Sequence, residues 1–188
     1  QQVQERLDSV AALKALALKN WANDLQNGLL VAVNDQSADA RISIVLDLAR
    51  THQYYDWYNE AVRLRLRALI EQSRQFGELC LLDTNGVVVL CTGSRQIVES
   101  LRDGSQNCQD ETFFQRGLAG PYVELPFEPP AQKSGRQTES PFGNNRDSAL
   151  CHFNSTALDA SASFVIAARP VIGSQREILG VIAGRAGG

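Results

Sequence analysis

The sequence predicts an α+β fold in which long helices come first and an antiparallel sheet built from hairpins follows. Nearly all of the chain before Phe76 has a helical pattern. After it, two pairs of apolar runs flank turn sequences, 79–82 and 87–90 around 83–86, and 164–172 and 178–185 around 173–177. Asn85-Gly86 in the first turn is the strongest short-range hairpin signal, and Gly173 suits the second turn.

The first 36 residues are expected to form a separate helical unit. Residues 4–33 contain no proline, and Gly28 is their only glycine. Their apolar residues form two stripes at helical spacing, Ala11, Ala15, Leu18, Ala22, Leu25 and Leu29 beside Val3, Leu7, Val10, Ala17 and Trp21. The spacing predicts a rod of roughly 45 Å that packs along much of its length. Two interpretations stay open, a core helix of one globular domain and a stalk helix that pairs with its copy in a homodimer.

The polar residues 34–39 predict a break, with a second helix that starts near Asp39 and is interrupted at 51–53. An aromatic cluster follows, in which we expect packing between helices in preference to a ligand cage; it comprises Tyr54, Tyr55, Trp57 and Tyr58. The charged residues of the next segment indicate a solvated helix face; they are Arg63, Arg65, Arg67 and Arg74 with Glu60 and Glu71.

Composition narrows the classes of function. The 188 residues suit one domain, with or without a helical stalk, and the net charge is −3. The basic excess of a nucleic-acid-binding protein is missing, and so is a disordered acidic tail. No run of eighteen apolar residues is present, so a membrane contact would need segments outside this sequence. Because the sequence contains no methionine, we expect it to be a piece of a larger protein.

Three segments in this order resemble the extracytoplasmic Cache sensor domain, a PAS-like ligand-binding module of bacterial receptors. They are "ELCLLDTNGVVVLCT" with its hairpin turn, the aromatic "QDETFFQRGLAG", and "AARPVIGSQREILGVIAGR" with its Pro-Val and Gly-Val pairs. The resemblance runs from about Leu64 to Arg185. It implies a PAS-like sensor module over residues 37–188, and "GVIAGRA" is similar to the junction that follows the membrane-distal module of double-Cache receptors.

The resemblance also implies a ligand site and a role. Arg116 would clamp a carboxylate, Phe114 and Tyr122 would form walls, and Asp110 would accept a hydrogen bond from an amine. One face of the closing hairpin would add Ile166 and Ala168, with Val165 and Ala167 facing the other way. Residues 110–114 lack the Arg-x-Trp-aromatic motif of the amino-acid-sensing branch, which speaks against an amino-acid ligand.

The expected role is that of an extracytoplasmic small-molecule sensor of a histidine kinase, a nucleotide cyclase or a chemoreceptor. The alternative is a non-sensing dimerisation or interaction module whose pocket is vestigial and filled by its own side chains. A ligand-driven shift of the closing hairpin against the first helix would carry the signal out of the domain. No cofactor is expected.

Four cysteines have spacings that fit no metal or redox motif. In an extracytoplasmic module they favour two disulfides, with Cys108–Cys151 the stronger expectation. A two-residue turn at Asn85-Gly86 would place Leu82 opposite Val89 and Cys80 opposite Cys91, whereas a longer turn would break that register. Four reduced, buried thiols remain the alternative.

Residues 126–156 are rich in proline, glycine and asparagine, which is typical of a long loop, either a lid over the ligand or a disordered insertion. Asn154-Ser155-Thr156 matches a glycosylation pattern that would be idle in a bacterium. An enzyme is the weakest interpretation. Cys151 and His152 are adjacent in sequence only, and nothing fixes the separation of the carboxylates Asp110, Glu111, Glu124 and Glu128.

Overall fold

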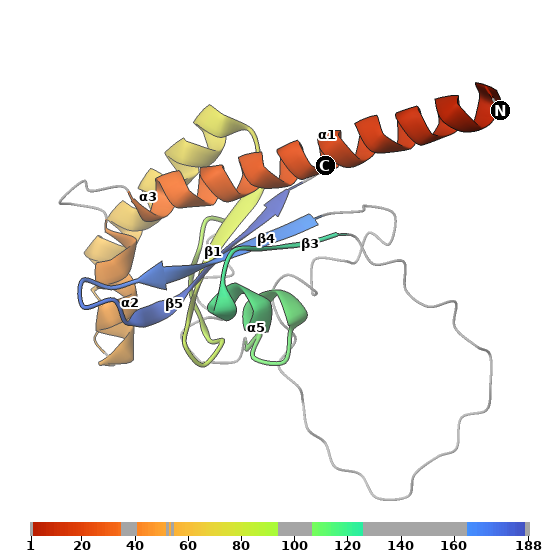
Figure 1. Cartoon of the computed structure of the whole chain (residues 1–188). Coiled ribbons are helices and arrows are strands. Elements are labelled where there is room, and N and C mark those ends of the chain that lie inside the picture. The colour runs from red at the N-terminus through yellow and green to blue at the C-terminus, as the bar shows by residue number, and fades with distance from the viewer. Residues whose placement is uncertain are drawn as a thin grey trace, which may run out of the picture.

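The computed structural model describes residues 2–34, 41–51, 53, 55–93, 107–125 and 165–186 (Figure 1). Three helices come first, α1 (Gln2–Val33), α2 (Ile42–Arg50) and α3 (Asp56–Ser73). The first hairpin and a short helix follow, β1 (Glu78–Asp83), β2 (Val88–Cys91) and α5 (Thr112–Ala119). The last elements are β3 (Tyr122–Glu124), β4 (Val165–Ile172) and β5 (Ile178–Ala186). The predicted order of helices and hairpins is confirmed.

The five strands form one antiparallel sheet in the order β2-β1-β5-β4-β3. Helices α1, α2 and α3 cover one face of the sheet, and α5 lies on the other (Figure 1). The predicted α+β class is therefore confirmed. Strand β5 pairs with β1 on one side and with β4 on the other, so it joins the two hairpins, β1–β2 and β4–β5, in a single sheet, and β3 extends that sheet beyond β4.

Helix α1 packs against the sheet only near its C-terminal end. Leu25, Leu29 and Ala32 are buried, whereas residues 3–20 are all exposed. In Figure 1 the N-terminal part of this helix projects beyond the sheet. The prediction that the stripe from Ala11 to Leu29 packs along much of its length is wrong within this chain, because nothing in the described residues covers its first half.

The second helical region is divided as predicted, with α2 ending at Arg50 and α3 beginning at Asp56. Helix α2 starts at Ile42, three residues after the predicted start, and the cap residue Arg41 has extended backbone angles. Tyr58 is buried and its hydroxyl accepts a hydrogen bond from the Arg41 amide at 3.0 Å. Tyr55 and Trp57 are exposed, and Tyr54 lies outside the described residues.

Arg63 corrects the prediction of a wholly solvated charged face on α3. Its side chain is only 7% exposed, and its guanidinium donates two hydrogen bonds to the carboxylate of Glu60, one turn earlier. The bidentate ion pair lets the arginine stem be buried while its charge stays paired. Hydrogen bonding to Glu60 raises the pKa of Arg63.

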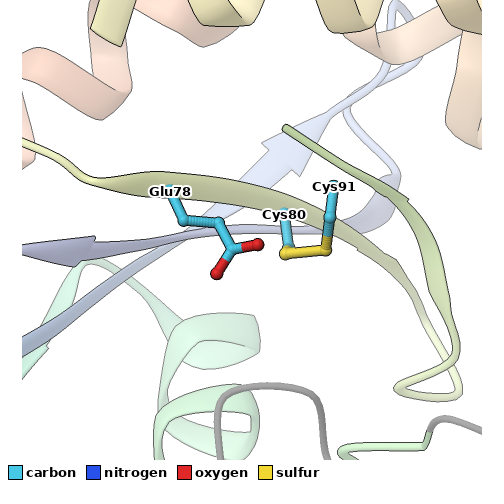
Figure 2. Close-up of side chains that lie close together, drawn as sticks. All are labelled: Glu78, Cys80 and Cys91. Atoms are coloured by element: carbon cyan, nitrogen blue, oxygen red, sulfur yellow. A yellow bond between two sulfur atoms is a disulfide. The ribbon is translucent and has the colours of Figure 1, made fainter. Parts of the chain in front are cut away.

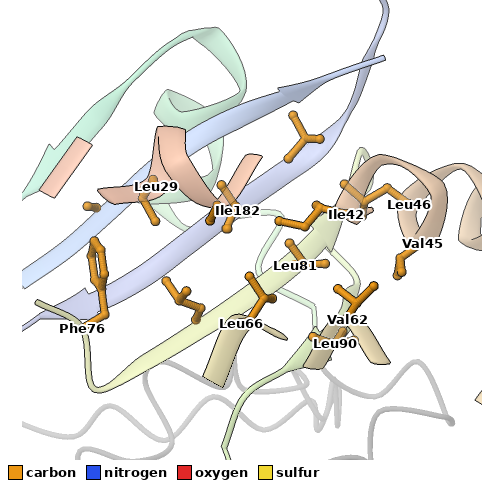
Figure 3. Close-up of a cluster of buried hydrophobic side chains, with 14 of the residues drawn as sticks. Leu29, Ile42, Val45, Leu46, Val62, Leu66, Phe76, Leu81, Leu90 and Ile182 are labelled. Carbon is orange, nitrogen blue, oxygen red and sulfur yellow. The ribbon is translucent and has the colours of Figure 1, made fainter. Parts of the chain in front are cut away.

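The main core lies between the three long helices and the sheet. Figure 3 shows Leu29 of α1, Leu46 of α2 and Leu66 of α3 converging on Leu81 and Ile182 from the two central strands. These aliphatic side chains are at most 1% exposed. Burial of this kind contributes about 1.5–3 kcal/mol for each large side chain, so this layer supplies most of the hydrophobic stabilisation.

In the first hairpin Cys80 faces Cys91 as predicted, but the turn is not the predicted two-residue turn. The amide of Asp83 donates to the carbonyl of Val87, which leaves a three-residue loop, and the Asp83 side chain accepts from the amides of Asn85 and Val87. Leu82 is paired with Val88, and not with Val89 as a two-residue turn predicts. A bulge between Leu81 and Leu82 then shifts the register, so that Cys80 still faces Cys91.

Candidate functional site

Strand β4 divides its side chains between the two faces of the sheet, as the alternation predicts. Val165 and Ala167 join the core under the long helices, and Ile166 and Ala168 join a second buried cluster under α5. Strand β3 pairs with it so that Tyr122 lies beside Ala168 and Glu124 beside Ile166. We call this side of the sheet, together with α5, the α5 face. Four of the six predicted ligand-binding residues meet here, Phe114, Tyr122, Ile166 and Ala168.

Helix α5 packs very closely against the sheet. A methyl group added at Gly117 would lie 2.8 Å from the Ala168 side chain and 3.2 Å from that of Val181. Phe113 and Phe114 are 1% and 2% exposed, and both belong to the cluster under the helix. The two adjacent rings therefore fill much of the space between α5 and the sheet with the chain's own side chains.

The other two predicted ligand-binding residues lie away from this buried cluster. Asp110 is exposed in the turn before α5, and Arg116 is exposed on the helix, one residue before the buried Gly117. Arg116 is not a member of the buried cluster that contains Phe114 and Ile166. The carboxylate clamp therefore stays a prediction, and the loop 126–156, predicted as a lid or a disordered insertion, lies outside the described residues.

Glu124 lies on the α5 face, whereas in the sequence it is only one of several carboxylates whose separation nothing fixes. Partial burial raises the pKa of Glu124, and the nearby charge of Glu111 raises it further. A hydrogen bond from the Phe113 backbone opposes these effects. The alternation of β3 was a usable signal, because Tyr122 and Glu124 must share a face. This edge of the face carries negative charge, which suits a positively charged group.

The Cys80–Cys91 disulfide lies on the same side of the sheet. It joins opposed residues of β1 and β2 whose Cα atoms are 4.1 Å apart, and both cysteines are buried. Figure 2 shows Glu78 beside it, two residues before Cys80 on the same face. The Glu78 carboxylate lies 3.5 Å from the Arg185 guanidinium. Glu78, Cys80 and Cys91 are grouped closely enough for metal ligation, but the two sulfurs are bonded to each other and neither is a thiolate.

Cys108 is also disulfide-bonded and fully buried. Its amide donates to the carbonyl of Gly86 at 2.8 Å, which ties the segment before α5 to the turn of the first hairpin. Its predicted partner Cys151 lies outside the described residues, together with His152, Glu128 and the Asn154 glycosylation pattern. Among the described part of the chain, no cysteine is free, so the alternative of four reduced thiols does not hold there.

Hydrogen bonds connect the α5 face to α1 through the sheet. The Gln26 side chain of α1 donates to the carbonyl of Tyr122 at 2.7 Å and to that of Ala168 at 3.2 Å. In return, the Arg169 guanidinium donates to the Gln26 carbonyl at 3.1 Å. Two strands that carry candidate site residues are thereby tied to the long helix.

A cavity of about 400 Å³ lies on the opposite side of the sheet, between α1 and α3. None of the predicted ligand-binding residues lines it. No helix among the described segments is both long and apolar enough to cross a membrane.

The sequence matches no protein-family model and no curated protein. Solved structures with a similar fold exist. The sensor domain of the V. cholerae histidine kinase DctB matches 99% of this chain and 55% of its own length, with 16% identity and a TM-score of 0.55. The ligand-binding domain of the Pseudomonas aeruginosa PAO1 amino acid chemoreceptor PctC, in complex with GABA, matches 88% of this chain and 60% of its own length, with 17% identity. Its TM-score of 0.36 is too low to inform the fold.

The chain has a fold similar to that of the DctB sensor domain, consistent with the α+β, PAS-like fold that the resemblance predicts. The chain spans little more than half the length of the solved structures that it resembles.

Proposed function

We propose that this chain is the extracytoplasmic small-molecule-sensing module of a bacterial transmembrane receptor. The observation that carries the proposal is the structural likeness to the DctB sensor domain, which extends over 99% of the chain. The receptor would be a histidine kinase, a nucleotide cyclase or a chemoreceptor, and the module itself would not be an enzyme. The two disulfide-bonded regions support an oxidising compartment.

The ligand is proposed to bind at the α5 face. This face combines apolar walls at Tyr122 and Ile166 with a carboxylate at Glu124, the mixture that small-molecule sites use. A carboxylate ligand would recruit Arg116 from its exposed position on α5, whereas an amine would use Asp110 or Glu124. Ligand contact with β3 and β4 would reach α1 through the bonds of Gln26 and Arg169.

The exposed half of α1 is proposed as a stalk that pairs with its copy in a homodimer. Its apolar side chains are exposed in this chain, including Val3, Leu7, Val10 and Leu13. Exposed apolar residues at spacings of three and four along one helix are typical of a helix–helix interface. The proposed unit of residues 1–36 therefore acts as a stalk over its first twenty residues and as part of the core thereafter.

A thermal-shift screen of the oxidised protein tests the sensing role against amino acids, small carboxylates, amines and purines. We expect one class to raise the melting temperature, since a ligand that binds only the folded state stabilises it. Arg116→Ala should abolish the shift for a carboxylate, and Asp110→Asn or Glu124→Gln should abolish it for an amine. Arg67→Ala, an exposed arginine of α3, is the matched control.

The second candidate function, a module without a ligand, has one specific observation in its favour. Phe113 and Phe114 already fill the space under α5. No shift with any ligand class, in a protein that still dimerises through α1, would favour this vestigial-pocket alternative and overturn the sensing role.

A further inference from the structure

The cavity between α1 and α3 is on the far side of the sheet from the α5 face. Its walls come from the second half of α1 and the last turn of α3, and its floor from the segment that leads into β1. A volume of about 400 Å³ is in the range of small-molecule sites. We call it the α1–α3 groove. Its lining shares no residue with the proposed sensing site.

The aromatic floor of the groove is Phe76, whose ring fits into space left by two glycines that are distant in sequence. Phe76, which is 5% exposed, lies where a methyl group at Gly28 of α1 would come within 3.1 Å of its ring. A methyl group at Gly184 of β5 would come within 2.6 Å of the other edge of the same ring. The ring therefore sits between α1 and β5, where Figure 3 shows it beside Leu29. A side chain at Gly184 would collide with the ring, whereas one at Gly28 would first meet the side-chain oxygen of Gln75 and then the ring.

The charge and polarity of the groove favour a cation. Among the described residues that line it, Asp24 is the one with an ionisable side chain. Helix α3 ends here, and the C-terminal turn of a helix carries a partial negative charge from carbonyls that lack partners. Asn27 and Gln72 add neutral polar groups at the rim. Arg74, which follows α3, is exposed and does not line the groove.

We propose that the α1–α3 groove binds a small organic cation, an ammonium group carried on an aromatic or short aliphatic body. The ammonium would pair with Asp24 and the end of α3, and the apolar body would lie against the part of Phe76 that lines the groove. An apolar helix from a second copy fits less well. It would remove Asp24, Asn27 and Gln72 from water without offering them hydrogen bonds, which is costly.

Titration of the whole 188-residue chain with benzylammonium tests the proposal, with phenylacetate as the probe of similar shape and opposite charge. Trp57→Phe leaves Trp21, one turn before Asp24, as the single fluorescent reporter. We expect saturable quenching by benzylammonium and none by phenylacetate. Asp24→Asn should weaken benzylammonium about tenfold or more, the effect of losing one charge-assisted hydrogen bond.

Two control variants establish that the cation binds in this groove and at no other carboxylate. Asp8→Asn removes an exposed carboxylate about four turns earlier on α1 and should leave the affinity unchanged. Glu124→Gln should also leave it unchanged, so that an amine bound at the α5 face is distinguished. Equal binding of phenylacetate, no saturable binding of benzylammonium, or no effect of Asp24→Asn would overturn the proposal. So would a dimer that dissociates on Val31→Glu, since it would place a second copy in the groove.

Discussion

The two faces of the sheet are covered in different ways. Under α1, α2 and α3 lies a layer of large aliphatic side chains from three helices, and no disulfide is found there among the described residues. The other face is covered by one eight-residue helix, α5, over a smaller cluster of aliphatic, aromatic and small side chains in which Cys80, Cys91 and Cys108 are buried. One face is thus stabilised by apolar area, and the other by less area together with covalent links.

The difference shows that a sheet face covered by one short helix needs other sources of stability. A short helix buries too little surface to order the segments before it, so cross-links and a close helix–sheet contact take over part of that role. The face under α1, α2 and α3 has more apolar area, and its core holds the second half of α1 in place. The α5 face is covered by one short helix, so it is the face better suited to change if the proposed ligand binds there.

The largest effect is expected from breaking the helix-covered face. Leu66→Ala should lower the free energy of unfolding by about 3 kcal/mol, because a buried leucine is replaced and a cavity remains. Leu64→Ala, two residues away on α3, is the matched control, since Leu64 is 53% exposed and Leu66 only 1%. Urea denaturation measures both variants, and equal losses would contradict the picture of a one-sided α3.

A smaller loss is expected on the α5 face when its cross-link is removed. Replacing Cys80 and Cys91 together by valine keeps the apolar pair but opens a loop that spans a sequence separation of 11. The loss should be about 2–3 kcal/mol, from the greater entropy of the unfolded chain. Denaturation with and without reductant provides the measurement: the variant should lose less on reduction than the native protein does. An unchanged stability would mean that packing alone orders this hairpin.

The close contact of α5 with the sheet is tested by Gly117→Val. The new side chain would collide with Ala168 and Val181, at a cost of about 2 kcal/mol. Gly120→Val is the control, because nothing lies within 4 Å of a methyl group placed at Gly120. Thermal unfolding should separate the two variants clearly. If Gly117→Val is as stable as the native protein, α5 sits less tightly on the sheet than described.

The smallest effect, and the one with a pH signature, concerns Glu124. Its pKa in the folded state is raised above the ordinary value of 4.5, so folding takes up a proton between these two values. Stability contributed by the neutral form is lost as the pH rises through that window. Glu124→Gln should therefore raise the melting temperature at about pH 7 and leave it unchanged near pH 3.

Glu71→Gln, an exposed carboxylate of α3, is the control for this pH profile. If Glu124→Gln raises the melting temperature equally at both pH values, the effect does not come from the charge of the partly buried Glu124 carboxylate.

The sequence predicted the helices, both hairpins and the two-faced pattern of β4, because these depend on local periodicity and turn residues. It did not predict the route of the first hairpin. The Asp83 side chain selects a three-residue loop, and the bulge near Leu82 then restores the register of Cys80 and Cys91. The bulge adds one residue to β2 without a glycine or proline at that point of the strand, so nothing in the local sequence marks it.

The candidate site was less predictable. The alternation rule placed Ile166, Ala168 and Tyr122 together, but Arg116 is exposed because its helix turns Gly117 toward the sheet. The α1–α3 groove had no signal in the sequence at all. It depends on Phe76 meeting glycines from the first helix and the last strand, and such a long-range meeting is fixed only by the tertiary fold.

The anchoring of α1 at one end makes it a mechanical lever. Residues 21–33 are held by the core and by the bonds of Gln26, and residues 2–20 form a free arm of roughly 28 Å. A rotation of about 2° at the anchored end would displace the far tip by about 1 Å. A movement of β4 too small to disturb the sheet would thus be enlarged at the tip of the arm.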